Sequence, residues 1–277
     1  AADAARGGIM LFDSHAHFDD AKFDMKNESG QILRDMLLSR AFDDDGVKCI
    51  INAGTSIKTG DISISLAEKY KRIYAAVGIH PEELEEAEKD PDGTLDKLKA
   101  QLCHPKVQAL GEIGLDYHYD TDKKLQKKWF ELQMDLAGKL DMPVQIHDRE
   151  AHGDCMDIVR RFPDVRGVFH SFSGSAEMAK ELIERGWYIS FSGVITFKNA
   201  VRIAEVVRSV PLDRILSETD SPYLAPHPFR GQLNYSGYVR LTVERLAELK
   251  GVSFDEMCSM TCNNACEFFG IDKEILN

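Results

Sequence analysis

Eight short apolar segments alternate with amphipathic segments along almost the whole chain, and this alternation limits the possible fold more than any other feature. Apolar runs of about four to eight residues are typical of buried strands, whereas apolar positions three to four residues apart are typical of helices. The predicted strands cover residues 9–12, 47–54, 73–79, 107–113, 143–147, 167–170, 187–191 and 214–219. The predicted helices cover residues 31–42, 58–70, 94–103, 123–140, 151–162, 175–185, 199–207, 238–250 and 253–269.

Strands that alternate with helices pair in parallel, because each helix returns the chain to the same end of the sheet. Eight such units without a proline- or glycine-rich linker predict one α/β domain, a (β/α)8 TIM barrel. The last two helices are expected to close the outside of this barrel. A doubly wound open sheet is the competing layout, but no glycine-rich phosphate-binding turn follows any strand to support it. We therefore expect residues 10–277 to form a single domain, since barrels of this length are common.

Three features of the sequence favour a cytoplasmic protein: its first residues, its lack of a long apolar stretch and its cysteines. Residues 1–9 are rich in Ala and Gly and lack the apolar core of a secretory signal, so we expect a cloning-derived extension before Met10. No apolar stretch reaches the roughly 18–20 residues that a membrane helix needs. The six cysteines form no CxxC pair, which is typical of reduced thiols in a cytoplasmic protein. Three of them share one helical face (Cys258, Cys262, Cys266), where burial as small apolar residues is favoured over a metal site.

Two histidines follow the first predicted strand, in the segment DSHAH at residues 13–17. Residues i and i+2 of a strand point to the same face, so His15 and His17 can present two imidazoles to one metal ion. A pair of buried, hydrogen-bonded histidines is the alternative. Later strand ends favour the metal interpretation because they also carry metal-binding side chains: His80, Glu112, His147, His170 and Asp220.

Barrels of this kind place their function at the carboxyl ends of the strands, and six of the eight strands end in one of these residues. The set is too large for one tetrahedral ion and favours two ions that share Glu112 as a bridge. Its histidines favour zinc, manganese or a similar ion over one that prefers oxygen alone. Two ions about 3.5–4 Å apart can polarise a phosphoryl oxygen and activate a water, and Asp220 can hold one ion and accept the proton of that water.

Six motifs carry a resemblance to a known family: DSHAH at 13–17, GIHP at 78–81, GEIGLDY at 111–117, QIHDR at 145–149, HSFSG at 170–174 and ETDSPY at 218–223. In order and spacing, from Leu11 to Phe269, the chain resembles the TatD family of metal-dependent DNases. The resemblance implies an amidohydrolase-like TIM barrel with two divalent ions. It implies that His15, His17, Glu112 and Asp220 surround one ion, and that Glu112, His147 and His170 surround the other.

The resemblance also implies hydrolysis of DNA phosphodiesters, as a 3'-5' exonuclease on single-stranded ends. The family is described with magnesium whereas histidine ligands favour softer ions, so magnesium, manganese and zinc all stay open. DNA is the expected partner, and neither a membrane nor an obligate protein partner is expected. A net charge of −12 argues against a broad basic footprint for duplex DNA, but it leaves room for ions or a local cationic pocket to attract a phosphate.

Four further residues are predicted to contact substrate: Arg149, His80, Asp116 and Tyr117. The guanidinium of Arg149 lies close enough to the predicted ions to bind a phosphate, and a surface ion pair with Asp148 or Glu150 is the alternative. We expect His80 to line the pocket without binding metal. Asp116 and Tyr117 follow the bridging glutamate closely enough to support the metal centre.

Two departures from the family pattern concern substrate contacts rather than metals. Where the family commonly continues with a basic residue, Arg-Asn, an acidic residue and Pro, this chain carries residues 232–236 with the sequence QLNYS. Glu82 stands where many members have a histidine.

Two other functions stay open beside the nuclease. One is an amidohydrolase or aminoacyl-tRNA deacylase that uses the same water, and the other is a catalytically inactive binding barrel, which the complete ligand set argues against.

Overall fold

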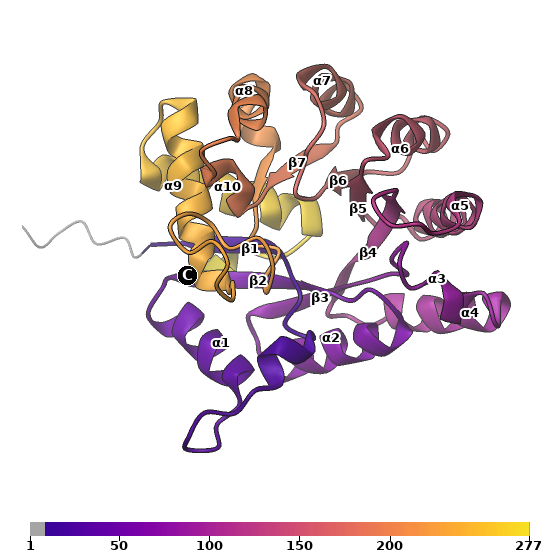
Figure 1. Cartoon of the computed structure of the whole chain (residues 1–277), viewed down its shortest axis with the longest axis horizontal. Coiled ribbons are helices and arrows are strands. Elements are labelled where there is room, and N and C mark those ends of the chain that lie inside the picture. The colour runs from indigo at the N-terminus through magenta and orange to yellow at the C-terminus, as the bar shows by residue number, and fades with distance from the viewer. Residues whose placement is uncertain (1–8, 277) are drawn as a thin grey trace, which may run out of the picture.

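The computed structural model describes residues 9–276, so the predicted cloning-derived extension lies outside the described residues except for Ile9. Eight parallel strands form one sheet in the order of the sequence (Figure 1). They are β1 (Leu11–Ala16), β2 (Val47–Ala53), β3 (Ile73–Val77), β4 (Val107–Asp116), β5 (Val144–Arg149), β6 (Gly167–Phe169), β7 (Tyr188–Phe191) and β8 (Ile215–Ser217).

Helices surround the strands in Figure 1: α1 to α8 lie between successive strands in the chain, and α9 and α10 follow the last strand. They are α1 (Leu33–Asp43), α2 (Ile57–Lys69), α3 (Leu84–Ala87), α4 (Pro91–Leu102), α5 (Lys123–Leu140), α6 (His152–Val159), α7 (Ala176–Glu184), α8 (Val201–Ser209), α9 (Val239–Lys250) and α10 (Phe254–Phe269). Every predicted helix is present with ends shifted by a few residues, and the short helix α3 is an addition.

The segment after β8 meets the carboxyl end of β1, which brings the two ends of the sheet together. The backbone N–H of Asp220 donates to the carbonyl of His15 (2.9 Å), and the N–H of His17 donates to the carbonyl of Ser221 (2.7 Å). Ala16 and Ser221 form a parallel bridge between the same segments. The eight parallel strands therefore form the predicted (β/α)8 barrel, which is nearly closed.

Polar residues continue the first strand beyond its apolar run. That run ends at Phe12, and β1 continues to Ala16, so it includes His15, which was predicted to lie at the carboxyl end of this strand. Asp13 pairs with Ile50 of β2. The side chain of Asp13 is fully buried and accepts hydrogen bonds from Thr219 N (2.9 Å) and Thr219 Oγ1 (2.6 Å). A buried polar group costs little when it is hydrogen-bonded, so the strand tolerates Asp13 at its centre.

Helix α10 closes the barrel at the amino ends of the strands, and not on the outside as the sequence had predicted. The ring of Phe269 stacks on that of Phe12 at the start of β1, with 6.1 Å between centroids. The ring of Phe268 lies 5.2 Å from that of Tyr188 at the start of β7. Apolar side chains of α10 thus cover the inward-facing residues at the bottom of the barrel. This leaves the carboxyl ends of the strands as the open end.

The cysteines follow the expectation for reduced thiols. All six are free, and the three on α10 are buried. No helix within residues 9–276 combines the length and the apolar character that crossing a membrane requires.

Candidate metal centre

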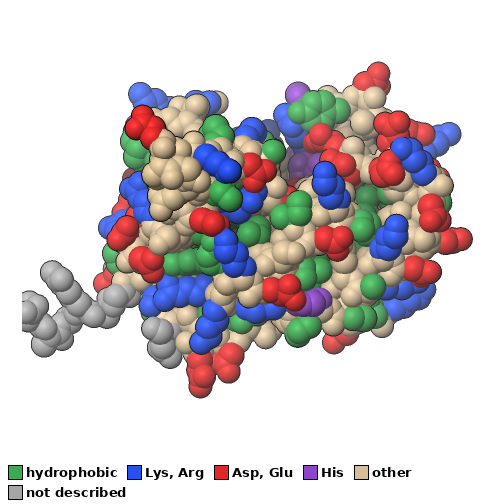
Figure 2. Space-filling view, turned by 90° about the horizontal axis from the view of Figure 1, so that it is seen from below, with side chains coloured by type: hydrophobic (Ala, Val, Ile, Leu, Met, Phe, Trp, Pro, Cys, Tyr) green, Lys and Arg blue, Asp and Glu red, His purple; other side chains and the backbone are tan. Residues whose placement is uncertain are grey.

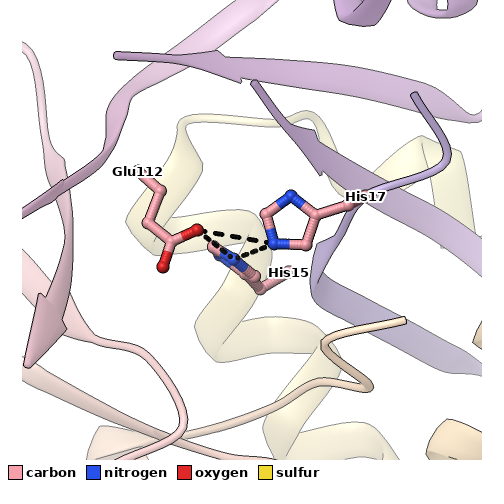
Figure 3. Close-up of side chains that lie close together, drawn as sticks. All are labelled: His15, His17 and Glu112. Atoms are coloured by element: carbon pink, nitrogen blue, oxygen red, sulfur yellow. Dashed lines mark hydrogen bonds and ion pairs between the residues drawn. The ribbon is translucent and has the colours of Figure 1, made fainter. Parts of the chain in front are cut away.

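Side chains from β1 and β4 meet at the open end of the barrel. Nε2 of His15 lies 3.1 Å from Nε2 of His17, and both atoms lie 3.4 Å from Oε2 of Glu112 (Figure 3). All three residues are buried. The strand alternation that placed His15 and His17 on one face therefore brings their ring nitrogens to a single point, where they face the carboxylate.

Asp220, which follows β8, adds a fourth donor to this group. Its Oδ1 lies 3.3 Å from Nε2 of His17 and 3.9 Å from Nε2 of His15. Ligands about 2.0–2.1 Å from an ion in tetrahedral arrangement lie about 3.3 Å from one another. The donor atoms of these two histidines, Glu112 and Asp220 therefore have spacings that suit one ion between them.

The other oxygen of Glu112 faces a second group of ring nitrogens. Its Oε1 lies 2.6 Å from Nδ1 of His147 and 2.7 Å from Nε2 of His170, and these two nitrogens are 3.2 Å apart. The two oxygens of Glu112 thus face different histidines, as a bridging carboxylate requires. The same side chains also form two other close groups, one of His15, His170 and Asp220 and one of His80, Glu112 and His147, so the division into the two implied ligand sets stays a prediction.

Gly114 lets β4 and β5 lie close enough for this contact. Its φ is +143°, and a Cβ at this position would lie 2.0 Å from the carbonyl oxygen of His147. A larger residue would push apart the two strands that carry Glu112 and His147.

Three of these histidines donate their outer ring nitrogen to a fixed acceptor, which leaves the lone pair of the inner nitrogen free for an ion. The bonds run from His17 Nδ1 to Ala53 O (2.7 Å), from His147 Nε2 to Asp116 Oδ2 (3.0 Å) and from His170 Nδ1 to Glu218 Oε1 (3.3 Å). Nδ1 of His15 is buried and has no hydrogen-bond partner within residues 9–276. The inner nitrogens of His15 and His17 face each other, so they need either a shared proton or a cation.

The carboxylates at the centre stay ionised despite their burial. Burial raises the pKa of Glu112, but the neighbouring His170, His80 and His147 outweigh it and hold the pKa well below its usual value. Burial also raises the pKa of Asp220, and its contact with His17 again reverses the shift. Without an ion, the same contacts raise the pKa of His17 to about 10 and that of His147 to about 9 despite burial, because each ring lies against a carboxylate. Buried carboxylates beside clustered imidazole nitrogens are the donor set that divalent cations bind, and a bound cation takes the place of these ring protons. The residues present therefore fit the metal ions that the sequence implies.

His80 belongs to the same cluster, but the ring nitrogen that it turns toward Glu112 is the protonated one. Its Nδ1 accepts a hydrogen bond from the backbone N–H of Glu82 (3.2 Å), so in the neutral ring Nε2 carries the proton. That nitrogen lies 3.5 Å from Oε1 of Glu112. Burial lowers the pKa of His80, which favours this neutral form. In this tautomer His80 can donate a hydrogen bond, although it also lies close enough to Glu112 and His147 to share an ion with them, so its role in the pocket stays a prediction.

Arg149 ends β5 with its side chain half exposed beside the metal cluster. Its Nη1 lies 4.0 Å from Oδ2 of Asp116, the carboxylate that holds His147. The alternative ion pairs do not form, because Asp148 contacts His152 and Glu150 contacts His118: the two distances are 2.7 and 3.0 Å. The guanidinium is therefore not held by either neighbour, and the phosphate contact of Arg149 stays a prediction.

The other two predicted substrate residues use their polar groups elsewhere. Asp116 is buried and bound to His147, so it supports the cluster from behind. Tyr117 donates its hydroxyl to Asp154 of α6 (2.6 Å), and Lys123 lies over its ring at 4.2 Å. Its hydroxyl is thus engaged away from the cluster, and a substrate role for Tyr117 stays a prediction.

Two buried glutamines on α5, two turns apart, hold the segments that carry His80 and Asp116. The side-chain amide of Gln126 bonds both backbone groups of Asp116: it accepts from the N–H (2.8 Å) and donates to the carbonyl (2.7 Å). Gln133 does the same for Ile79, at 2.7 and 3.0 Å. Sequence reasoning missed both glutamines. Their signal was two polar residues seven positions apart on the apolar face of an amphipathic helix.

The departure at residues 232–236 serves the barrel rather than a substrate. Nδ2 of Asn234 donates to the carbonyl of Thr219 (2.9 Å), and Oγ of Ser236 donates to Oδ2 of Asp13 (2.6 Å). Both side chains are buried. This loop therefore secures the segment that leads to Asp220.

The surface near the centre mixes charges of both signs. Figure 2 shows histidine side chains inside a hollow near the upper edge of the face in view, bordered by acidic, basic and hydrophobic side chains. Lysines, arginines and acidic residues alternate over the rest of that face. No broad basic surface is visible there, in agreement with the net charge of −12.

A TIM barrel whose open end holds buried histidines around a shared glutamate defines the class of metal-dependent hydrolases. The model of the family described as TatD related DNase matches residues 12–270, and the chain belongs to this TatD family. The protein is thus a TatD-family metal-dependent hydrolase.

Named relatives agree with this assignment. The uncharacterized metal-dependent hydrolase YabD of Bacillus subtilis strain 168 is 40% identical over 267 residues, which cover 95% of this chain and 100% of that protein. YcfH of Escherichia coli K12, with the same description, is 36% identical over 95% of this chain and 97% of its own. The crystal structure of the TatD homolog YjjV from Escherichia coli K12 has a TM-score of 0.85 and 32% identity, and covers 95% of this chain and 98% of that one.

Proposed function

We propose that this hydrolase cleaves phosphodiester bonds of DNA, as a 3'-5' exonuclease on single-stranded ends, with two divalent ions per chain. One observation carries the proposal: each oxygen of Glu112 faces its own pair of histidine nitrogens, at 3.4 Å on one side and at 2.6 and 2.7 Å on the other. A carboxylate shared in this way suits a two-ion site, and such sites are typical of phosphodiester hydrolysis. The family's description as DNase-related supports DNA as the substrate.

The first ion would be held by His15, His17, Glu112 and Asp220, and the second by Glu112, His147 and His170. When bound, two such ions neutralise a phosphoryl group and lower the pKa of water. The residues of the chain supply the remaining parts of the mechanism.

Asp220 is the proposed base. Its carboxylate is ionised and only slightly exposed, and it reaches the cluster from the turn after β8. It can accept the proton of an attacking water, because a general base must lie within hydrogen-bond reach of the water it deprotonates. His80 presents an N–H to the same cavity and can donate to a phosphoryl oxygen. Arg149, half exposed at the rim, can bind the phosphate next in the strand.

A hydrolysis screen tests the proposal directly. Single-stranded DNA, duplex DNA, RNA, a simple phosphodiester, an amide and an aminoacyl ester are each incubated with magnesium, manganese and zinc in turn. We expect cleavage of single-stranded DNA, and a 5'-labelled oligonucleotide should shorten one nucleotide at a time. Asp220→Asn protein purified in the same way serves as the control for a contaminating nuclease. Hydrolysis of the amide or the aminoacyl ester without cleavage of DNA would overturn the proposal.

A further inference from the structure

Only two aromatic side chains of Phe, Tyr or Trp are widely exposed within residues 9–276. They are Tyr119, with 47% of its surface exposed, and Tyr223, with 44%. Aromatic rings are normally buried because their large apolar surface is costly to hydrate. An exposed ring therefore needs an explanation, above all when both examples lie near one site.

Tyr223 borders the metal centre directly, and Tyr119 is linked to it through Arg149. The ring of Tyr223 lies 6.3 Å from the ring of His17, measured between centroids. Tyr119 lies beside Arg149, whose guanidinium carbon is 5.4 Å from the centroid of its ring, and Arg149 in turn approaches Asp116 behind His147. Each exposed ring is thus tied to one of the two ligand groups around the bridging glutamate.

The two rings stand on opposite sides of the barrel mouth. Tyr223 follows β8, and Tyr119 follows β4. In a barrel whose strands follow the sequence order from β1 to β8, β4 lies across from β8. The carboxylates and imidazoles of the metal centre occupy the space between them. A chain that crosses the mouth over the ions would therefore meet one tyrosine before the ions and the other after them.

A cation lies over each ring. Nζ of Lys22 is 3.9 Å from the centroid of Tyr223, whose hydroxyl donates to Asp20 (2.5 Å) and so holds the ring in place. Arg149 provides the cation for Tyr119. The cation covers one face of each ring, so a base would stack on the opposite face while its phosphate binds the cation.

We propose that Tyr119 and Tyr223 are stacking platforms for the two bases that flank the scissile phosphodiester. This inference rests on the proposed function and narrows it to strands whose bases are free to leave their stack. Bases inside a duplex are already stacked on their neighbours, so the platforms select single-stranded ends. The two tyrosines are therefore specificity-determining residues of this nuclease.

The test combines protein variants with abasic substrates. Tyr119→Leu and Tyr223→Leu remove one platform each, while Tyr119→Phe and Tyr223→Phe keep the ring and serve as the conservative rescue. The substrates are a short single-stranded DNA oligonucleotide and two versions that lack the base on one side or the other of the scissile bond. We expect each Leu variant to raise KM for the intact oligonucleotide at least about fivefold, the range of one base–aromatic stack. On the oligonucleotide that lacks the base on the matching side, the Leu variant and the wild type should have the same KM.

Each outcome decides one question. An unchanged KM for the intact oligonucleotide in both Leu variants would overturn the stacking proposal and leave the nuclease intact. An equal loss on intact and abasic substrates would overturn it too, since the effect would then not pass through a base. If the wild-type protein cleaves none of these oligonucleotides with any of the three ions, the proposed function itself fails. Melting temperatures of the variants confirm that each is folded.

Discussion

The carboxylate of Asp116 lies 3.0 Å from Nε2 of His147, on the opposite side of the ring from Glu112. Asp116 is almost fully buried, and its pKa is lowered because the contact with His147 outweighs the effect of burial. A charged acceptor behind a metal-binding imidazole fixes its orientation and raises its basicity. Asp116 therefore acts on the metal centre without touching the space where the ions would lie.

Asp116→Asn should weaken metal binding at the His147 position by about 10- to 100-fold, the usual cost of losing such a partner. The amide keeps a neutral acceptor, so the fold should survive. Titration of metal-free protein with manganese or zinc measures the change. Asp154→Asn is the matched control, because Asp154 contacts Tyr117 and Lys127 away from the cluster. Equal affinities in Asp116→Asn and wild type would remove Asp116 from the metal centre.

Glu112→Ala should lose both ions, whereas His147→Ala should mainly empty one position. The reason is that Oε1 and Oε2 of Glu112 face different histidine pairs, while His147 contacts only the Oε1 side. Metal content per chain after desalting, measured by elemental analysis, tests this difference. The bridging assignment would be wrong if the two variants retained the same number of ions.

Asp220→Asn should fold like the wild type, retain part of its metal and lose at least about a hundredfold in kcat on single-stranded DNA. The amide oxygen can still bind an ion weakly, but it cannot accept a proton at neutral pH. Single-turnover rates at saturating DNA separate this loss from weaker binding. A variant with more than about a tenth of the wild-type kcat would show that another residue is the base.

Arg149→Ala should raise KM for an oligonucleotide more than KM for a small phosphodiester, and the metal content should not change. The half-exposed guanidinium is free of Asp148 and Glu150 and is placed for a phosphate beyond the scissile one. Arg161→Ala, which removes an exposed arginine that pairs with Glu131 on the helical side, is the matched control. A similar change in KM for both substrates would indicate that Arg149 serves the local fold.

The barrel and its cluster could be predicted because both follow from simple periodicities. Strand residues two apart share a face, so His15 and His17 had to converge, and parallel strands end on one side, which gathers Glu112, His147 and His170. The length of β1 could not be predicted in this way. Asp13 looks like a strand breaker until Thr219, far away in the sequence, supplies its hydrogen bonds.

Features that depend on long-range packing were missed for the same reason. The apolar face of α10 has the same sequence pattern whether the helix covers the outside of the barrel or its lower opening. Only the contact of Phe269 with Phe12 distinguishes these two positions. Near the mouth, the short distance in sequence from Glu112 to Tyr117 predicted that Tyr117 supports the metal centre. The backbone instead directs that ring toward Asp154 and exposes Tyr119 two residues later.

The closure of the barrel also has a consequence for protein synthesis. His15 and His17 leave the ribosome early, but the backbone partner of His15 is Asp220, and the partners of Asp13 are Thr219 and Ser236. The first strand therefore has to wait for almost the entire chain before its buried polar groups are satisfied. An incomplete nascent chain lacks the last metal-binding carboxylate as well as the loop that secures it. A fragment that ends before Thr219 therefore lacks both Asp220 and the groups that bond Asp13, so it cannot assemble the complete metal centre.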